Sequence, residues 1–212
     1  MTTGIKQYLG TRKLKQAVFT ANGSFTVPAG VTEVFITGCG GGGSGGFSAS
    51  SSVAPYKDGN NGGPTQFGTL YGLSGGLGGR GTGTSPSSVP GGGRGGPGGQ
   101  PGQSGYFATG TGLAELCGDG GDCGPYSGGR ACNDYGAGGL NVRDGSYGAG
   151  GAGGSAYSYP AGGGGGAAYV ERKMLTVIPG STYGILIGKG GAYPNSLSGN
   201  GGDGILIVEW WE

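Results

Sequence analysis

The feature that most constrains this chain is a set of triplets in which two of every three residues are glycine. Three such triplets follow one another over residues 92–100, and the design recurs at 75–80 and 149–155. Period three is that of the polyproline II helix, which forms no internal hydrogen bonds. Glycine lets neighbouring backbones approach closely enough to bond to one another. We therefore predict several polyproline II helices packed side by side.

Glycine supplies 62 and proline 11 of the 212 residues, a share that often signals disorder. Four runs rich in β-branched and aromatic residues argue instead for strands: Val31–Thr37, Met174–Ile178, Ile185–Ile187 and Ile205–Trp211. Ordering each residue costs about 1–2 kcal/mol of backbone entropy, so the glycine region needs rigid anchors. We predict an all-β fold, a glycine-rich β-sandwich-like framework with packed polyproline II helices and almost no α-helix.

Local signals add turns and boundaries to this prediction. Asn22-Gly23 between alternating apolar residues predicts a hairpin over 18–27. A turn at Pro28-Ala29-Gly30 then leads into the strand from Val31. A collagen helix is not expected, because Ala108 breaks the register of a glycine at every third residue. The domain is expected to cover residues 18–212.

Several classes of function are not expected. The net charge of +1 gives no field that attracts nucleic acid, and no apolar run approaches the ~18 residues of a membrane span. The chain has no histidine, which excludes Ser-His-Asp and Cys-His catalysis. Lys189 lies among glycines without the context of a P-loop, and paired C-x-x-C spacing is absent. We expect no enzyme, no cofactor and no metal site.

The first 17 residues form a basic arm without an acid. This pattern fits either a solvated leader or a docking peptide that becomes ordered on a larger partner. The candidate docking residues are Lys6, Arg12, Lys13 and Lys15. The N-terminus also lacks the apolar core of a secretion signal, which predicts synthesis in the cytoplasm.

Residues 104–160 hold most of the large side chains in the middle of the chain, without a period of 2 or 3.6, which predicts an insertion of ordered loops. Tyrosines in such loops offer a large contact area at low entropic cost. One interpretation is therefore a surface that binds a glycan or protein, and the other is a small core beneath the loops. The candidate binding residues are Tyr106, Phe107, Tyr126, Arg130, Tyr135, Tyr147, Tyr157 and Tyr159.

The four cysteines permit three pairings. A disulfide within the insertion, either Cys117–Cys123 or Cys123–Cys132, is the interpretation we favour, because a loop-rich segment gains from a cross-link. The alternative is four free thiols. Cys39 lies in a predicted framework strand, so we expect a buried thiol or a bond to another subunit.

Several pieces of the chain together resemble the glycine-rich domain of bacteriophage tail fibres and adhesins. The first is Phe-Thr-Val-Pro-Ala-Gly-Val at 25–31, followed by a strand and a glycine block. Matching pieces occur at 62–69, 176–183, 187–191 and 201–209, so the resemblance spans most of residues 18–212. The piece at 62–69 precedes the one at 176–183, where the family arrangement has it after.

The resemblance implies a virion protein, made in the host cytoplasm without a signal peptide, whose polyproline II bundle presents loops to the host surface. We expect a tail fibre tip, spike or fibre-like decoration that contacts other virion proteins, with a homotrimer favoured by the resemblance. The alternative is a purely structural accessory protein that reinforces the capsid, neck or tail without receptor binding. A third interpretation, an ice-binding protein, requires a flat face of small residues that the irregular insertion interrupts.

Overall fold

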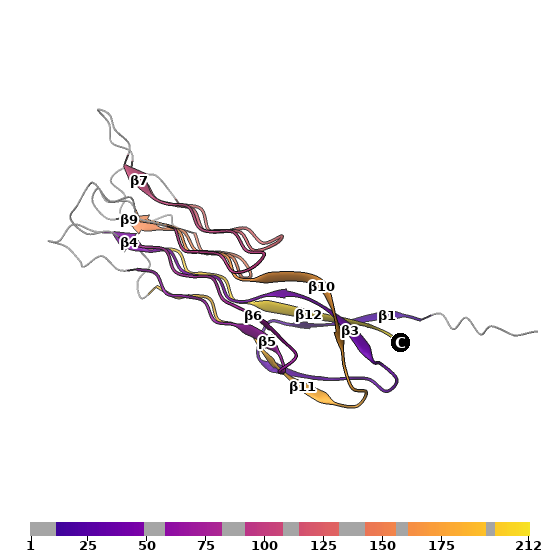
Figure 1. Cartoon of the computed structure of the whole chain (residues 1–212). Coiled ribbons are helices and arrows are strands. Elements are labelled where there is room, and N and C mark those ends of the chain that lie inside the picture. The colour runs from indigo at the N-terminus through magenta and orange to yellow at the C-terminus, as the bar shows by residue number, and fades with distance from the viewer. Residues whose placement is uncertain are drawn as a thin grey trace, which may run out of the picture.

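The computed structural model describes residues 12–48, 58–81, 92–107, 115–131, 143–155, 161–193 and 198–212, and these contain strands and extended segments but no helix (Figure 1). No described segment could therefore cross a membrane as a helix. The strands are β1 (Leu14–Phe19), β2 (Gly23–Thr26), β3 (Glu33–Cys39), β4 (Phe47–Ser48), β5 (Thr65–Phe67), β6 (Tyr71–Leu73), β7 (Tyr106–Phe107), β8 (Glu115–Leu116), β9 (Gly154–Ser155), β10 (Tyr169–Thr176), β11 (Thr182–Leu186) and β12 (Ile205–Trp211).

Two antiparallel sheets of four strands form the framework. One has the order β1-β12-β3-β10 and the other β2-β11-β5-β6. Strand side chains alternate between faces, so β3 sends Val34 and Ile36 into the core and β12 sends Leu206 and Val208. The second sheet contributes buried residues such as Phe25, Phe67 and Ile185 to the same cluster. The predicted all-β class is confirmed.

The glycine-rich segments pack beside the framework as a bundle that we call the glycine bundle. It consists of residues 40–46, 59–63, 75–80, 92–96, 99–103, 118–122, 127–130, 149–154, 161–168, 188–193 and 199–204. At their far end, two-residue strands also pair: β4 runs parallel to β9, and β7 is antiparallel to β8.

Segment 40–46 shows how the bundle is connected. Its successive N–H groups donate in turn to segments 161–168, 59–63 and 199–204, at N···O distances of 2.9–3.1 Å, and return to the same neighbour every third residue. Its carbonyls accept from 75–80, 188–193 and 149–154. A period of three along the backbone is that of polyproline II. The segment as a whole therefore bonds to six neighbouring segments.

Segment 161–168 is surrounded in the same way. It donates to residues 74–80, 100–103 and 148–151 and accepts from 40–46, 92–96 and 118–121. A Cβ atom built on Gly164 would lie 2.1 Å from the Gly43 carbonyl oxygen. The contact is with backbone, which cannot rotate away as a side chain can. Glycine is needed here because the backbones occupy the space that side chains would fill.

The molecule has two distinct ends (Figure 1). The sheets form one end, which we call proximal, and the glycine bundle extends from them to the opposite, distal end. Hydrogen-bonded pairs mark the levels between the two ends: Gly40 bonds to Ala168 next to the sheets, and Gly46 bonds to Gly162 at the distal end.

The predicted hairpin over 18–27 is wrong. β1 pairs with β12 in one sheet, whereas β2 pairs with β11 in the other. Gly23 does not have the positive φ that a type I′ turn requires. Instead, the side-chain oxygen of Asn22 accepts a hydrogen bond from Ile187 N–H at 2.8 Å, so the connection crosses from one sheet to the other.

Three further boundaries differ from the sequence-based prediction. Residues 14–17 belong to β1 and not to an arm, because they pair with β12. The triplets at 92–100 form two bundle segments, since Gly98 has φ +80° and Gly99 N–H bonds to Gly96 O in a reversing turn. Within 104–160, segments 118–122, 127–130 and 149–154 are part of the bundle, so this region is more than an insertion of loops.

Candidate functional site

The distal end is formed by the outer ends of the bundle segments and by the strand pairs β4–β9 and β7–β8 (Figure 1). The described residues that border 49–57, 82–91, 108–114, 132–142, 156–160 and 194–197 all lie at this end (Figure 1). Hydrogen bonds place them there: Gly81 N–H bonds to the Asp58 carboxylate at 3.1 Å, and Ser198 Oγ donates to the Gly45 carbonyl at 3.0 Å.

An aromatic pair lies within the distal end. Phe47 is 1% exposed, and its ring lies 6.0 Å from that of Tyr193, which is also buried. This burial raises the pKa of the Tyr193 hydroxyl. Tyr193 N–H donates to the side-chain oxygen of Asn200 at 2.8 Å. The contact between the two rings joins β4 to bundle segment 188–193 at the distal end. The glycine context of both aromatics concealed this role in the sequence.

The predicted binding residues do not form a single surface. Tyr106 and Phe107 lie in β7 and Arg130 lies beside Arg143, all toward the distal end. Tyr126 and Tyr147 instead lie where the bundle meets the sheets. Tyr135, Tyr157 and Tyr159 fall outside the described residues.

Tyr126 and Tyr147 support the second interpretation, a small core. Their rings meet edge to face at 5.6 Å, and Tyr126 packs against a buried cluster that includes Cys39 and Cys123. Burial, and then the neighbouring Cys39 and Cys123, raise the pKa of the Tyr126 hydroxyl. Tyr147 is 42% exposed. The glycine bundle separates this pair from the distal residues of the predicted set.

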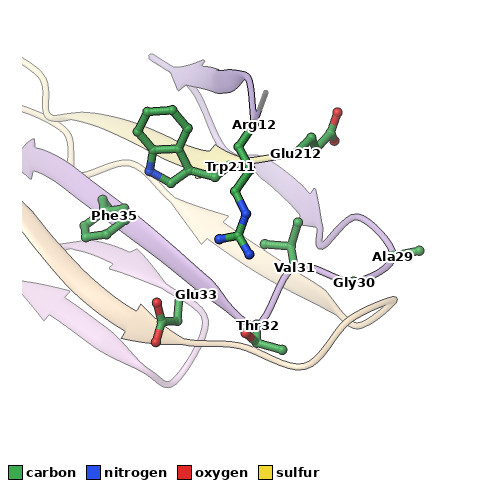
Figure 2. Close-up of a pocket in the computed structure, with 9 residues that line it drawn as sticks. All are labelled: Arg12, Ala29, Gly30, Val31, Thr32, Glu33, Phe35, Trp211 and Glu212. Atoms are coloured by element: carbon green, nitrogen blue, oxygen red, sulfur yellow. The ribbon is translucent and has the colours of Figure 1, made fainter. Parts of the chain in front are cut away.

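The proximal end carries a pocket of about 630 Å³ (Figure 2). Arg12 reaches into its middle between Trp211 and Val31. Phe35 lies on the same side as Trp211, Glu33 lies below the guanidinium in this view, and Glu212 points away. The lining residues are Arg12, Ala29, Gly30, Val31, Thr32, Glu33, Phe35, Trp211 and Glu212. The pocket thus combines aromatic walls with one cation, Arg12, and one carboxylate, Glu33.

Local structure explains why these side chains meet. Trp210 packs on Phe25 in the core at a ring distance of 5.2 Å, so Trp211 must point to the outer face, where it is 44% exposed. Successive side chains of a strand alternate between faces, which places the two tryptophans on opposite sides of β12. Phe35 lies on the same outer face, covered by the Arg172 guanidinium 5.4 Å from its ring centroid.

Arg172 is held at an irregularity in β10. It has φ 47°, and its N–H bonds to Thr37 Oγ1 at 3.0 Å where the register with β3 shifts. Its guanidinium lies 3.6 Å from the Glu209 carboxylate. The bulge therefore directs a cation over the outer face. Neither of the two ion pairs between described residues includes Arg12 or Glu33.

The predicted docking residues lie partly at this proximal end. Arg12 lines the pocket, Lys13 exchanges backbone hydrogen bonds with Glu212, and Lys15 is exposed in β1 opposite Trp210. Lys6 lies outside the described residues. Sequence reasoning identified the cations but missed Phe35, Glu33 and Val31. Only the pairing of β1 with β12 brings residue 12 to them.

The cysteines differ from the predicted pairing. Cys123 is a free thiol that contacts Cys39 and donates to the Ala167 carbonyl at 3.4 Å, so the structure has neither predicted disulfide. Six residues of extended chain at about 3.1 Å each separate Cys117 from Cys123 by roughly 19 Å, too far for the ~7 Å Cα limit of a disulfide. Cys39 is a buried thiol, one of its two predicted states. Cys132 lies outside the described residues.

Among the described residues, no three potential ligands gather into a metal site. Asp119 and Asp122, which lie in a sequence that loosely resembles a calcium loop, instead accept backbone hydrogen bonds from Ala131 and Gly128 at 2.7 and 2.8 Å. No model of a known protein family matches the chain, and no curated protein matches it either.

Proposed function

We propose that the protein is a bacteriophage virion appendage, a tail fibre tip, spike or fibre-like decoration, that presents its distal end for attachment to the host surface. The observation that carries the proposal is the polarity of the molecule. The sheets form one end and carry the pocket that Arg12 enters, while the glycine bundle extends from them to an opposite end that bears the strand pairs β4–β9 and β7–β8. This arrangement suits a scaffold held at one end and exposed at the other.

The proximal pocket would bind another virion protein. Trp and Arg are the side chains most enriched among residues that dominate binding energy. Here Trp211 and Phe35 provide apolar walls, and Arg12 and Glu33 provide charges of both signs. An apolar side chain flanked by a polar or charged group, supplied by a partner segment, fits this composition.

A structural accessory role is the second candidate function. Tyr126 and Tyr147, both from the predicted binding set, pack where the bundle meets the sheets and are not brought to the distal end. Fewer of the predicted aromatics are then available for a receptor. In this role the protein would dock through its proximal pocket and reinforce the capsid, neck or tail.

Binding of the purified chain to a panel of intact bacterial cells tests the proposal. Removing the whole of 104–160 is unsuitable, because 118–122, 127–130 and 149–154 belong to the bundle. Residues 132–142 and, separately, 156–160 should therefore be replaced by Gly/Ser linkers of equal length. We expect the intact chain to bind cells and at least one replacement to lose binding while its melting temperature stays unchanged.

A matched proximal variant distinguishes the two ends. Trp211→Ala, which alters the exposed wall of the pocket, should leave cell binding intact and reduce incorporation into virions. If the folded intact chain binds no strain of the panel and yet is incorporated through the pocket, the accessory role replaces the attachment role.

A further inference from the structure

The junction between the framework and the glycine bundle contains two buried thiols from distant parts of the chain. Cys39 ends β3, and Cys123 begins the turn that joins segments 118–122 and 127–130. Both are free thiols with 0% exposure, and they belong to one buried cluster with Ala149, Ala167 and Ile205.

The surrounding backbone keeps the two sulfur atoms together. Cys39 is paired with Tyr169 on one side and Ile205 on the other, so β3 is fixed at this point. The turn is closed by the reciprocal backbone bonds between Cys123 and Tyr126, at 2.9 and 3.0 Å. Each thiol is the largest influence on the pKa of the other, as expected for two groups that lie in contact within one buried cluster.

Little free space remains around the pair. A Cβ atom at Gly148, which has φ +67°, would lie 2.5 Å from the Cys39 sulfur. The Cys123 thiol also bonds to the Ala167 carbonyl at 3.4 Å. Both side chains are therefore enclosed by neighbouring backbone and have little room to move apart.

We propose that Cys39 and Cys123 form a latent disulfide, a redox-modification site that ties the outer segments 118–130 to the framework when the protein meets a peroxide. The proposal does not depend on the proposed function, because it concerns the chemistry of the junction alone. It also differs from a bond within the 104–160 region, since it joins positions 39 and 123, 84 residues apart.

The reaction balances with one peroxide. The thiolate of one cysteine attacks a peroxide oxygen, which gives a sulfenic acid and releases hydroxide. The second thiol then attacks the sulfenic sulfur and displaces its hydroxyl group, so that two thiols and one hydrogen peroxide give one disulfide and two waters. Local opening of the outer segments admits the oxidant.

The electrostatics of the pair support an order of attack. The neighbouring Cys123 thiol, opposed by burial, lowers the pKa of Cys39, whereas the neighbouring Cys39 thiol and then burial raise the pKa of Cys123. Cys39 therefore supplies the first thiolate and Cys123 the resolving thiol.

Peptide mapping of the full chain after treatment with hydrogen peroxide tests the proposal. Cleavage after Lys and Arg combined with cleavage before Asp yields residues 16–57, which contain Cys39 alone, and residues 122–130, which contain Cys123 alone. We expect these two peptides to be joined, with a mass lower by two hydrogen atoms than their sum. Their separation by a reductant completes the assignment.

The thermal stability of the same samples provides a second measurement. A cross-link that closes a long loop should raise the melting temperature by roughly 5–10 °C, reversibly on reduction. Cys117→Ser is the matched control that should retain this rise, whereas Cys123→Ala should lose it. Because the peptide map uses the unmodified chain, it decides the matter even if Cys123→Ala does not fold.

Three results would overturn the proposal. The first is a link from 122–130 to a peptide that contains Cys117 or Cys132. The second is oxidation of Cys39 and Cys123 to separate sulfinic acids in the folded protein. The third is a Cys39–Cys123 link that forms only after the chain has been unfolded.

Discussion

The framework and the glycine bundle are stabilised in opposite ways. In the framework, backbone bonds run within sheets and the space between the sheets is filled by side chains such as Val34, Ile36 and Val208, all fully buried. In the bundle, the backbones themselves fill the interior, and each central segment exchanges hydrogen bonds with six neighbours. One region buries apolar side chains, and the other buries peptide groups.

This difference determines which substitutions each region tolerates. An apolar core accepts another side chain of similar volume at modest cost. The bundle interior has no room for even one carbon at most glycines, because the added Cβ meets a carbonyl oxygen. Its few larger residues occupy specific places. Ser44, for example, accepts a hydrogen bond from Asn60 N–H at 2.8 Å.

The largest expected effect comes from adding one methyl group inside the bundle. At Gly42 a Cβ would lie 2.0 Å from the Ala149 carbonyl oxygen, so Gly42→Ala should destabilise the protein by more than about 4 kcal/mol. Gly184→Ala in β11 is the matched control, since nothing lies within 4 Å of its Cβ position. It should change stability by less than about 1 kcal/mol. Thermal unfolding by circular dichroism measures both, and equal effects would contradict the comparison.

A cavity in the framework should have the next largest effect. Phe67 is 1% exposed and stacks on Tyr183 at 5.2 Å, so Phe67→Ala should cost about 3–5 kcal/mol. Ile178→Ala, at a position 66% exposed, should stay within about 0.5 kcal/mol.

The same variant tests whether the framework anchors the bundle. Fluorescence of Trp210 and Trp211 reports the framework, and the reactivity of the buried Cys123 thiol reports the bundle. We expect the two signals to change at the same denaturant concentration. A bundle that persists after the tryptophan transition would show that it does not need the sheets.

A smaller effect is expected at the bundle surface, where a side chain accepts a backbone hydrogen bond in place of a carbonyl from a neighbouring segment. The side-chain oxygen of Asn61 accepts a hydrogen bond from Gly78 N–H at 2.9 Å. Asn61→Ala should cost about 0.5–1.5 kcal/mol, and Asn61→Asp, which keeps the acceptor, should cost less. Urea unfolding measures the difference, and equal losses in both variants would rule out this role for the acceptor.

The smallest effect should be the contribution of Asp203 to the pH dependence of the protein's stability. Burial works to raise its pKa, but hydrogen bonds from Lys189 at 2.7 Å and Gly190 N–H at 2.9 Å outweigh it, so the pKa is lowered. The stabilisation is therefore present above the ordinary carboxyl pKa of about 4 and is lost as the pH falls through the lower folded value.

Its magnitude should stay below about 1 kcal/mol, because the Lys189 and Asp203 side chains are 77% and 41% exposed. Melting temperatures between pH 6 and pH 2 should fall less in Asp203→Asn than in the unmodified protein. Parallel curves for the two proteins would show that this carboxylate does not contribute.

Local patterns in the sequence were sufficient to predict those structural elements in which each residue's role depends on its immediate neighbours. The β-branched runs predicted β3, β10, β11 and β12, and the glycine triplets predicted segments that bond every third residue. The alternation of side chains along β12 likewise accounts for a Trp210 ring that packs on the core and a Trp211 ring on the outer face. These features follow from the geometry of a single extended segment.

Other features depended on which segments become neighbours. Asn22-Gly23 has the composition of a hairpin turn but joins two sheets, because β1 and β2 each find a better-matched partner late in the chain. The proximal pocket likewise requires residue 12 to lie beside residues 31–35 and 211–212. No local spacing encodes those proximities.

The sequence by itself determined the class of the fold and the two kinds of packing, since side-chain volume decides where sheets or bare backbones can fill the interior. Only the tertiary structure decided that Cys39 meets Cys123, that Tyr126 and Tyr147 lie far from the distal end, and that Arg12 enters a pocket. The physical reason is that glycine segments resemble one another in sequence. The choice of neighbours is therefore made by the cooperative set of backbone hydrogen bonds, and no individual segment specifies its own partners.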